Sequence, residues 1–138
     1  MKISLKLEYA CRVLAYMGRL YDGGSQLAHI EILAQAEDVP RNYLVQILNS
    51  LRNGGLLNSR RGKQGGYTLA RPPTEITLYE IVAIIDPDML EIRASRKGES
   101  SVAVNEVWAS FSASVNETLQ KTTLASLIPR YATALYDI

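Results

Sequence analysis

The sequence predicts a mainly α-helical protein that carries one small two-stranded β hairpin and a long helix near its C-terminus. Three observations support this prediction. Apolar residues recur at helical spacing in several stretches, a basic, glycine-containing stretch joins two short strand-like runs, and one apolar stripe continues from about residue 102 to residue 122. With 138 residues and 47% hydrophobic content, the chain can form one domain with its own core and an extension.

The first two helices are predicted from apolar spacing and from the residues that flank it. The first should run from about Ser4, which suits a helix N-cap, to about Tyr21, where the stretch Asp22–Ser25 ends it. The second should run from about Ala28 to Ala36.

The third helix is expected over Pro40–Asn53, because proline suits a first helical turn. Its buried face follows the i, i+3, i+4, i+7 pattern and comprises Leu44, Ile47, Leu48 and Leu51. The opposite face then carries Arg41, Asn42, Tyr43, Val45, Gln46 and Asn49.

The hairpin is predicted directly after this helix. Gly54-Gly55 should end the helix, and Leu56–Arg61 and Gly66–Ala70 should form the two strands, with Gly65-Gly66 as the turn signal. Pro72-Pro73 ends the second strand and argues against an immediate helix.

The C-terminal part should consist of helices joined by a loop. Thr77 and Glu80 form a capping box for a fourth helix that ends near Ile85, and Asp86-Pro87 closes it. We expect a mobile loop over Arg93–Ser101 and a long fifth helix over about Val102–Thr122. A short sixth helix should follow at Leu124, Leu127 and Ile128, and the tail Arg130–Ile138 should be loosely held.

The long helix carries one apolar stripe, and a lone helix that projects from a small domain needs something to cover it. Because a second copy of the chain is the simplest cover, we expect a homodimer. The predicted dimer residues are Val104, Trp108, Phe111, Val115 and Leu119.

Charge is distributed unevenly along the chain. The formal net charge is only +1, from 15 basic and 14 acidic residues. Between Val39 and Thr74, however, the chain has no acidic residue, and its basic residues there are Arg41, Arg52, Arg60, Arg61, Lys63 and Arg71. A helix followed by a basic, glycine-tipped hairpin is typical of a winged helix-turn-helix, so the pattern predicts binding to double-stranded DNA. A merely solvated basic face is the alternative.

Several other classes are not supported by the sequence. No apolar run approaches the roughly 20 residues that span a bilayer, and the N-terminus lacks a secretory signal, so we expect a cytoplasmic protein without a membrane partner. The single cysteine, Cys11, cannot form an internal disulfide. No nucleophile and base pair, paired-ligand spacing or phosphate-binding loop indicates an enzyme.

Several motifs occur together in one order along the chain. They are Ser4, Lys6 and Tyr9-Ala10, then Tyr43–Leu48, Leu51–Leu56, Arg61–Tyr67 and Ile76–Leu78. Together they closely resemble the Rrf-two family of bacterial transcription regulators, whose best-known member is the iron–sulfur cluster regulator. The resemblance is strong over about Met1–Asp86 and weaker over the later helix.

The resemblance implies a homodimeric winged-helix repressor at a partly palindromic operator. Its third helix would lie in the major groove and its wing in an adjoining minor groove, where Arg61 matches the family's minor-groove arginine. Asn42 and Tyr43 match positions that contact DNA in the family. We accordingly divide the chain into a DNA-binding domain, residues 1–86, and a loop, dimerisation helix and tail, residues 87–138. The full predicted DNA-binding set is Arg41, Asn42, Tyr43, Val45, Gln46, Arg52, Arg60, Arg61, Lys63 and Tyr67.

The chain departs from the family pattern at two places. Some members have a glutamate where this chain has Val45, which cannot accept a hydrogen bond but could pack on a thymine methyl group, so a different operator is expected. Iron–sulfur members carry three cysteines before the long helix, whereas Asp88–Asn105 has none. Because clusters need several thiolate ligands, the sequence argues against a cluster or any other cofactor or metal.

Three residues could still have a sensing role, but simpler interpretations are favoured. Cys11 shares a helix face with Leu7, which favours a buried, inert thiol over a redox sensor. His29 is more consistent with a solvated or phosphate-facing side chain than with a metal ligand. Glu8 matches an acidic position that completes the cluster in some family members, although an ordinary helix residue is the simpler interpretation.

A sequence-specific regulator is the leading function, and two alternatives stay open. The first is a winged helix that docks a metabolic enzyme, which would bind DNA weakly and without regard to sequence. An enzyme is the second and the least supported. The signal could be a small molecule between the long helices and the winged domain, in a pocket that Trp108 and Phe111 help to line, or a protein effector, or protein concentration alone. The loop Arg93–Ser101 is the expected place for an effector to act.

Overall fold

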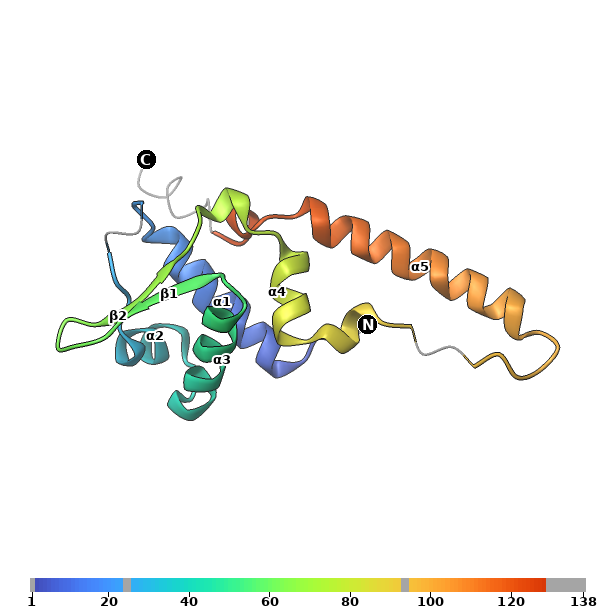
Figure 1. The fold of residues 1–138 in the computed structure, drawn as a ribbon, viewed down its shortest axis with the longest axis horizontal. Helices are drawn as coiled ribbons and strands as arrows, with labels where there is room; N and C mark the ends of the chain where they lie inside the picture. Colours follow the sequence, from blue (N-terminus) through green and yellow to red (C-terminus); the bar gives the residue numbers. More distant parts are fainter. Residues whose placement is uncertain (1, 24–25, 93–94, 129–138) are drawn as a thin grey trace, which may run out of the picture.

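The computed structural model of the chain describes residues 2–23, 26–92 and 95–128. It confirms the predicted class, with helices dominating and one two-stranded antiparallel sheet (Figure 1). The elements are α1 (Leu5–Arg19), α2 (Ile30–Glu37), α3 (Arg41–Asn53), β1 (Leu57–Arg60), β2 (Gly66–Leu69), the 3-10 helix η1 (Pro73–Glu75), α4 (Leu78–Ile85), η2 (Pro87–Leu90), α5 (Ser101–Lys121) and η3 (Leu124–Leu127).

Helix α1 is the central helix of the folded body. Ser4 caps it as predicted, because the Leu7 N–H donates to the Ser4 hydroxyl at 3.2 Å. The helix ends at Arg19, slightly before the predicted end. Leu7, Ala10 and Leu14 on its apolar face are fully or almost fully buried, so α1 supplies one wall of the core to which α3, α4 and the sheet also contribute.

Helices α2 and α3 form the helix-turn-helix. Helix α2 ends where Asp38 adopts a left-handed backbone with φ of 52°, and α3 begins directly after Pro40. The four leucine and isoleucine residues predicted for the buried face of α3 are all fully buried. Burying this face fixes the rotation of α3, which turns its polar face outward.

The wing is the β1–β2 hairpin, and its register runs from Leu57 opposite Leu69 to Arg60 opposite Gly66. At its tip the Gly65 N–H donates to the Gly62 carbonyl at 3.0 Å, and Gly62 has a φ of +117°, which glycine adopts without strain. The second predicted turn glycine has another role. Gly66 lies in β2, where the backbone of Ala28 forms a bridge with Tyr67, and a Cβ at Gly66 would lie 2.7 Å from the Ala28 carbonyl oxygen.

The chain between the wing and α4 differs in one detail from the prediction. The two prolines do end the strand region, but the 3-10 helix η1 begins at the second of them, because proline is tolerated in a first helical turn. The capping box is present as predicted, with the Glu80 N–H donating to Thr77 Oγ1 and the Thr77 N–H donating to Glu80 Oε2. The 3-10 helix η2, which was not predicted, follows α4 at the predicted Asp86-Pro87 break.

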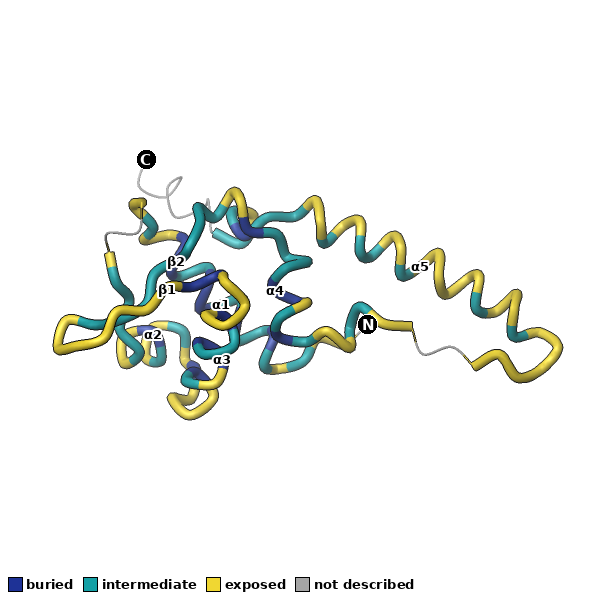
Figure 2. The backbone as a smooth tube through the Cα atoms, in the orientation of Figure 1, coloured by how far each residue is buried: buried dark blue, intermediate teal, exposed yellow. Residues whose placement is uncertain are grey.

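Helix α5 extends away from the folded body (Figure 1), and the wing points toward the opposite end of the molecule. Two hydrogen bonds anchor the C-terminal end of α5. The Leu78 N–H donates to the Thr122 carbonyl, and the Leu124 N–H donates to the Ile76 carbonyl, both at 2.8 Å. Along the rest of α5 no residue is buried, as Figure 2 shows by the alternation of exposed and intermediate positions.

The predicted boundaries near the C-terminus are close to those observed. The long helix begins at Ser101, and the short sixth helix is the 3-10 turn η3 rather than an α-helix. Part of the expected loop, residues 93–94, and the expected tail lie outside the described residues. Within the described residues, none of the helices combines the length and the apolar character needed to cross a bilayer.

Candidate DNA-binding surface

The outward face of α3 carries the residues predicted to read DNA. Arg41, Asn42, Tyr43 and Gln46 are exposed, whereas Val45 is half-buried at the edge of this face. Since the buried residues of α3 pack against α1, these side chains project from a helix whose position and rotation are fixed. Amide and hydroxyl groups on such a face can bond to base edges or phosphates, and an isopropyl group can contact a thymine methyl.

Tyr43 is positioned by contacts that the sequence did not indicate. Its ring meets the ring of Tyr9 on α1 edge to face, with 6.0 Å between the centroids. The Arg12 guanidinium lies over the ring of Tyr9, 5.3 Å from its centroid. Arg12 in turn donates to the Glu8 carboxylate and to the Glu37 carbonyl. A chain of contacts therefore links α1, the end of α2 and the exposed tyrosine of α3.

Arg41, at the start of α3, contacts Glu31 of α2. Arg41 Nε and Glu31 Oε1 are 3.6 Å apart, and both side chains are about two-thirds exposed, at 65% and 70%. An ion pair this exposed contributes little to stability, so Arg41 can exchange the carboxylate for a phosphate at small cost.

The wing presents a cluster of exposed basic residues. Arg60, Arg61 and Lys63 are all exposed, and no carboxylate within residues 2–23, 26–92 and 95–128 forms an ion pair with any of them. Arg52, near the end of α3, is exposed in the same way. Tyr67 differs from these residues, because it is half-buried and its backbone pairs with Ala28. Because the basic side chains of the wing are exposed and have no carboxylate partner among the described residues, they can attract a polyanion at low desolvation cost.

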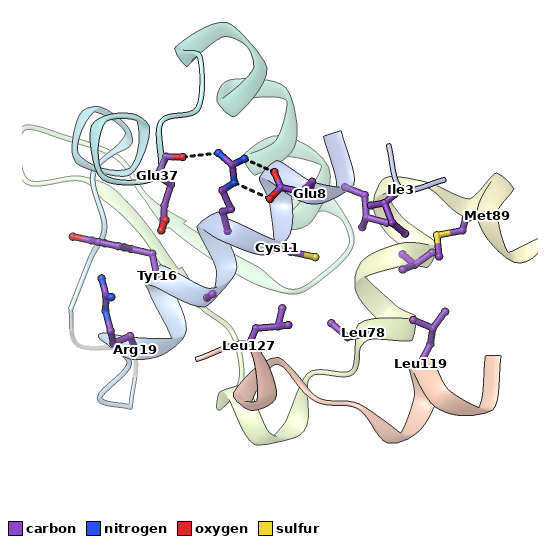
Figure 3. A pocket seen from close by; sticks show the side chains of 14 residues that line it. Ile3, Glu8, Cys11, Tyr16, Arg19, Glu37, Leu78, Met89, Leu119 and Leu127 are labelled. Carbon is purple, nitrogen blue, oxygen red and sulfur yellow. Dashed lines mark hydrogen bonds and ion pairs between the residues drawn. The ribbon is translucent and has the colours of Figure 1, made fainter. Parts of the chain in front are cut away.

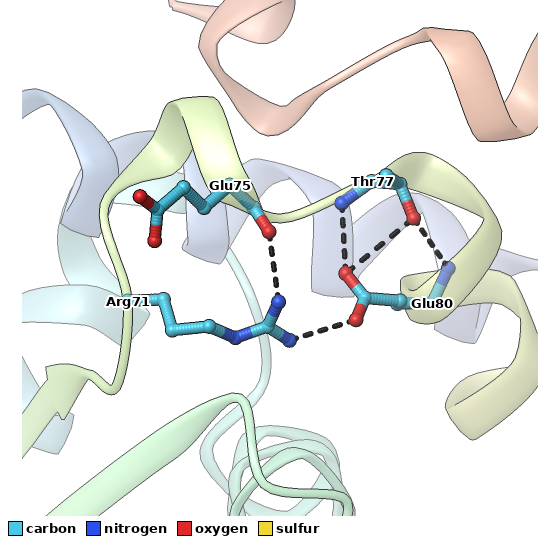
Figure 4. Close-up of polar contacts among 4 residues, drawn as sticks. All are labelled: Arg71, Glu75, Thr77 and Glu80. Atoms are coloured by element: carbon cyan, nitrogen blue, oxygen red, sulfur yellow. Dashed lines mark hydrogen bonds and ion pairs between the residues drawn. The ribbon is translucent and has the colours of Figure 1, made fainter.

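Arg71, the last basic residue of the acid-free segment, has a structural role instead. Its Nη2 donates to Glu80 Oε1 and its Nη1 donates to the Glu75 carbonyl, each at 2.8 Å (Figure 4). Partial burial penalises the charge of Glu80 and raises its pKa, but the hydrogen bonds from Arg71 and from the Thr77 N–H together outweigh burial and lower the pKa below its ordinary value. Arg71 thus joins the end of the wing to the capped start of α4, and its charge is already partnered.

The predicted dimer residues lie on α5, with different degrees of exposure. Trp108 and Phe111 are 56% and 62% exposed, and their ring centroids are 5.6 Å apart. Val104 is also exposed, whereas Val115 and Leu119 become half-buried toward the folded body. The stripe is therefore continuous from the outer part of α5 to its base, and its outer part is largely open in the single chain.

Glu8 and Cys11 line a cavity of about 460 Å³ next to α1. Side chains from α1, α2, α4, η2, α5 and η3 line it (Figure 3). The aliphatic side chains and Met89 face charged ones on α1 and α2, among them Arg12, Arg19 and Glu37.

Burial, with a smaller contribution from the Glu8 carboxylate, raises the pKa of the Cys11 thiol to about 11. Cys11 is therefore a neutral thiol at neutral pH, which agrees with the interpretation of Cys11 as a buried, unreactive thiol. His29 lies apart from this cavity, at the N-cap of α2.

The residues present do not fit an iron–sulfur cluster. The whole sequence contains one cysteine, whereas clusters are held by several thiolates. The described parts of the chain also lack any group of three or more histidine, cysteine, aspartate or glutamate residues that could hold a metal ion. Glu8, which could have added a carboxylate ligand, is paired with Arg12, with Arg12 Nη2 2.7 Å from Glu8 Oε2.

The fold and this surface define a winged helix-turn-helix protein with a projecting helical arm. Residues 3–130 match the Rrf2 family, described as iron-dependent transcriptional regulators. The chain therefore belongs to the Rrf2 family, which the motifs of the sequence had indicated. It is a DNA-binding transcriptional regulator and not an enzyme.

Individual relatives agree with this assignment. Rv1287 of Mycobacterium tuberculosis (strain H37Rv), named as a candidate HTH-type transcriptional regulator, is 34% identical over 99% of this chain and 89% of its own length. The HTH-type transcriptional regulator CymR of Bacillus subtilis (strain 168) is 31% identical over 92% and 89%. The solved structure of B. subtilis CymR, described as a global cysteine regulator, superposes with a TM-score of 0.79 at 30% identity, over 92% of this chain and 95% of CymR.

Proposed function

We propose that this chain is a homodimeric repressor that binds a partly palindromic operator in the cytoplasm. Residues 1–86 read the DNA, and α5 joins the two copies. The observation that carries the proposal is the pairing of an outward polar face on α3 with an adjacent wing whose cations have no carboxylate partner among the described residues.

The division of labour between α3 and the wing follows from their side chains. Helix α3 presents two amides, those of Asn42 and Gln46, a phenol and the side chain of Val45, which suit base edges in a major groove. The wing presents guanidinium and ammonium groups on a narrow hairpin, which suit the negative potential of a minor groove and its phosphates. Arg61 at the tip is the minor-groove residue in this proposal, and Arg60 and Lys63 engage phosphates.

A repressor that binds a palindrome needs two DNA-binding domains, one for each half-site. Two-fold protein symmetry produces operator symmetry, with half-sites separated by about one helical turn of 10–10.5 base pairs or a multiple of it. The long exposed stripe on α5 supports the dimer, because an apolar surface of this length is normally covered.

A selection of bound duplexes from random DNA tests the proposal. We expect enrichment of a palindrome, and Val45→Glu should change the preferred base at one position in each half-site, because glutamate can accept a hydrogen bond from a cytosine amino group. Gln35→Glu, which introduces the same charge at an exposed position on α2, is the matched control. Binding that enriches no sequence would contradict the proposal and favour the enzyme-docking alternative.

A further inference from the structure

Carboxamide side chains form a row along the outward face of α3. The row consists of Asn42, Gln46, Asn49 and Asn53. Each of them lies two positions from Leu44 or Leu51, which are fully buried, and two positions turn a helix by about 200°. The row therefore lies opposite the buried face. Its spacing of i, i+4, i+7 and i+11 keeps it on one side of α3 from the first turn to the last.

These amides have no partners within the chain. Asn42, Gln46 and Asn53 are exposed, and Asn49 is half-buried. Within the part of the chain that the structure describes, none of the four side chains takes part in a hydrogen bond. Each amide combines an amino group that donates with a carbonyl oxygen that accepts. The row is therefore ready to form paired hydrogen bonds with an external partner.

The row contains no charged side chain. The two cations of α3, Arg41 and Arg52, are eleven residues, or about three turns, apart, so both lie on one flank of the row at opposite ends of the helix. Arg41 is directed toward Glu31 of α2, as their 3.6 Å contact shows. In known complexes arginine and lysine read guanine, and glutamate and aspartate accept from cytosine. The row itself lacks all of these groups.

Val45 borders the row on the same flank as the two arginines, because it is one turn after Arg41. It is half-buried and offers only methyl groups to a ligand. Thymine is the base that presents a methyl group in the major groove. The amides of Asn42 and Gln46 are four residues apart, which is about 6 Å along the axis, or about two base-pair steps. The valine and these two amides thus face the same short stretch of groove.

We infer that α3 reads A·T base pairs alone. Asn42 and Gln46 each bind one adenine, with the amide N–H donating to N7 and the amide oxygen accepting from the N6 amino group, and Val45 contacts a thymine methyl group. These residues lie in the N-terminal half of α3, which is the part of a recognition helix that contacts base edges. The inference rests on the proposed function and adds the base pairs that the half-site contains under α3.

The wing favours the same base pairs from the other groove. A·T tracts have a narrow minor groove, and its negative potential attracts an inserted arginine. Arg61 is exposed and has no carboxylate partner in the described ranges of the chain. A half-site rich in A·T pairs therefore suits both the amides of α3 and the cation of the wing.

Base analogues in the selected operator test the inference at single atoms. 7-Deazaadenine has a C–H group in place of N7 and pairs normally, so it removes one of the two hydrogen bonds to an amide. At an adenine that α3 reads, it should weaken wild-type binding about 3- to 10-fold. Gln46→Ala and Asn42→Ala should each abolish this penalty at one adenine. Gln35→Ala, which removes an exposed amide from α2, is the matched control and should keep both penalties.

The thymine contact is tested in the same way with deoxyuridine, which lacks the methyl group. Its substitution for one thymine of the half-site should weaken wild-type binding about fourfold, the effect expected for one buried methyl group. In Val45→Ala the same substitution should have little effect. All titrations are made at low salt, where the phosphate contacts keep the variants bound.

Two results would overturn the inference and leave a sequence-specific dimer standing. The first is a penalty from 7-deazaguanine that disappears in Arg41→Ala or Arg52→Ala, because an arginine of α3 would then read guanine. The second is a 7-deazaadenine penalty that is equal in wild type, Asn42→Ala and Gln46→Ala, because the amides would then not contact adenine. A selection that enriches no sequence would instead overturn the proposed function, and the inference with it.

Discussion

Arg71 and Glu80 form a bond that connects the wing to α4. Arg71 Nη2 lies 2.8 Å from Glu80 Oε1, and the same carboxylate accepts the Thr77 N–H through its other oxygen. Thr77 lies in the segment that pairs with the residues after α5, so the hydrogen bonds continue from the wing to the base of the arm. The β1–β2 hairpin and the arm thus share one polar connection.

Loss of this bond should reduce stability without removing a DNA contact. Arg71→Ala should lower the free energy of unfolding by about 1 kcal/mol, a value kept small because both side chains are about one-third exposed. Arg52→Ala, which removes an exposed arginine, should leave it within about 0.5 kcal/mol of wild type. Urea unfolding of both variants measures this, and equal losses in the two would contradict the structural role of Arg71.

The same bond predicts a dependence of stability on pH. The pKa of Glu80 is lowered in the folded chain below its ordinary value of 4.5, so the folded state favours the carboxylate. Its contribution should be complete above about pH 5 and should decrease as the pH falls below 4.5 through the lower folded pKa. The difference in unfolding free energy between wild type and Glu80→Gln, measured from pH 3 to 7, should become smaller at the acidic end. If the difference in unfolding free energy between wild type and Glu80→Gln grew as the pH fell, the pKa of Glu80 would not be lowered in the folded chain.

Cys11 should react slowly with thiol reagents. Its pKa is about 11 in the folded chain and 9.0 as a model thiol, so the thiolate fraction at pH 8 is about 100-fold smaller in the folded protein. Iodoacetamide alkylation at pH 8 should accordingly be at least about 100-fold slower in native buffer than in guanidinium chloride. Similar rates in the two solutions would show that the thiol is not buried in the way described.

Gly54 should not tolerate even a methyl group. A Cβ built at this position would collide with Ile84 Cδ1 and lie 2.7 Å from Ile84 Cγ1, where the end of α3 meets α4. Gly54→Ala should therefore cost about 1–3 kcal/mol of unfolding free energy, even though its φ of −80° suits alanine. In a chain that already carries Ile84→Ala, the added cost of Gly54→Ala should be much smaller. If the cost of Gly54→Ala were the same in both backgrounds, it would come from the backbone of residue 54 and not from contact with Ile84.

Local sequence patterns predicted the elements of this fold because each of them depends on neighbours along the chain. Ser4 and the Thr77–Glu80 box mark helix starts through contacts three residues apart, and the buried face of α3 follows helical spacing. The hairpin could likewise be predicted from the positions of its glycines along the chain. Gly66, however, lies close to the backbone of Ala28, which only the tertiary structure reveals.

The contacts that position the candidate site were not predictable in this way. Arg71 looked like one more cation of a DNA-facing segment, but its partner Glu80 is nine residues away and was assigned only as a capping residue. Tyr9 and Tyr43 lie on separate helices, and no periodic pattern indicates that their rings meet. Long-range pairs of this kind depend on how α1, α3 and α4 pack, which local spacing does not determine.

Binding titrations of the selected duplex at two salt concentrations show most directly whether the wing contacts DNA. We compare wild type with Arg61→Ala and use Arg71→Ala as the matched loss of one arginine. Arg61→Ala should weaken binding and change the salt dependence of the affinity by about one released counterion per wing, whereas Arg71→Ala should keep the wild-type salt dependence. If Arg61→Ala binds the operator with wild-type affinity and wild-type salt dependence, Arg61 does not contact DNA and the proposed role of the wing is wrong.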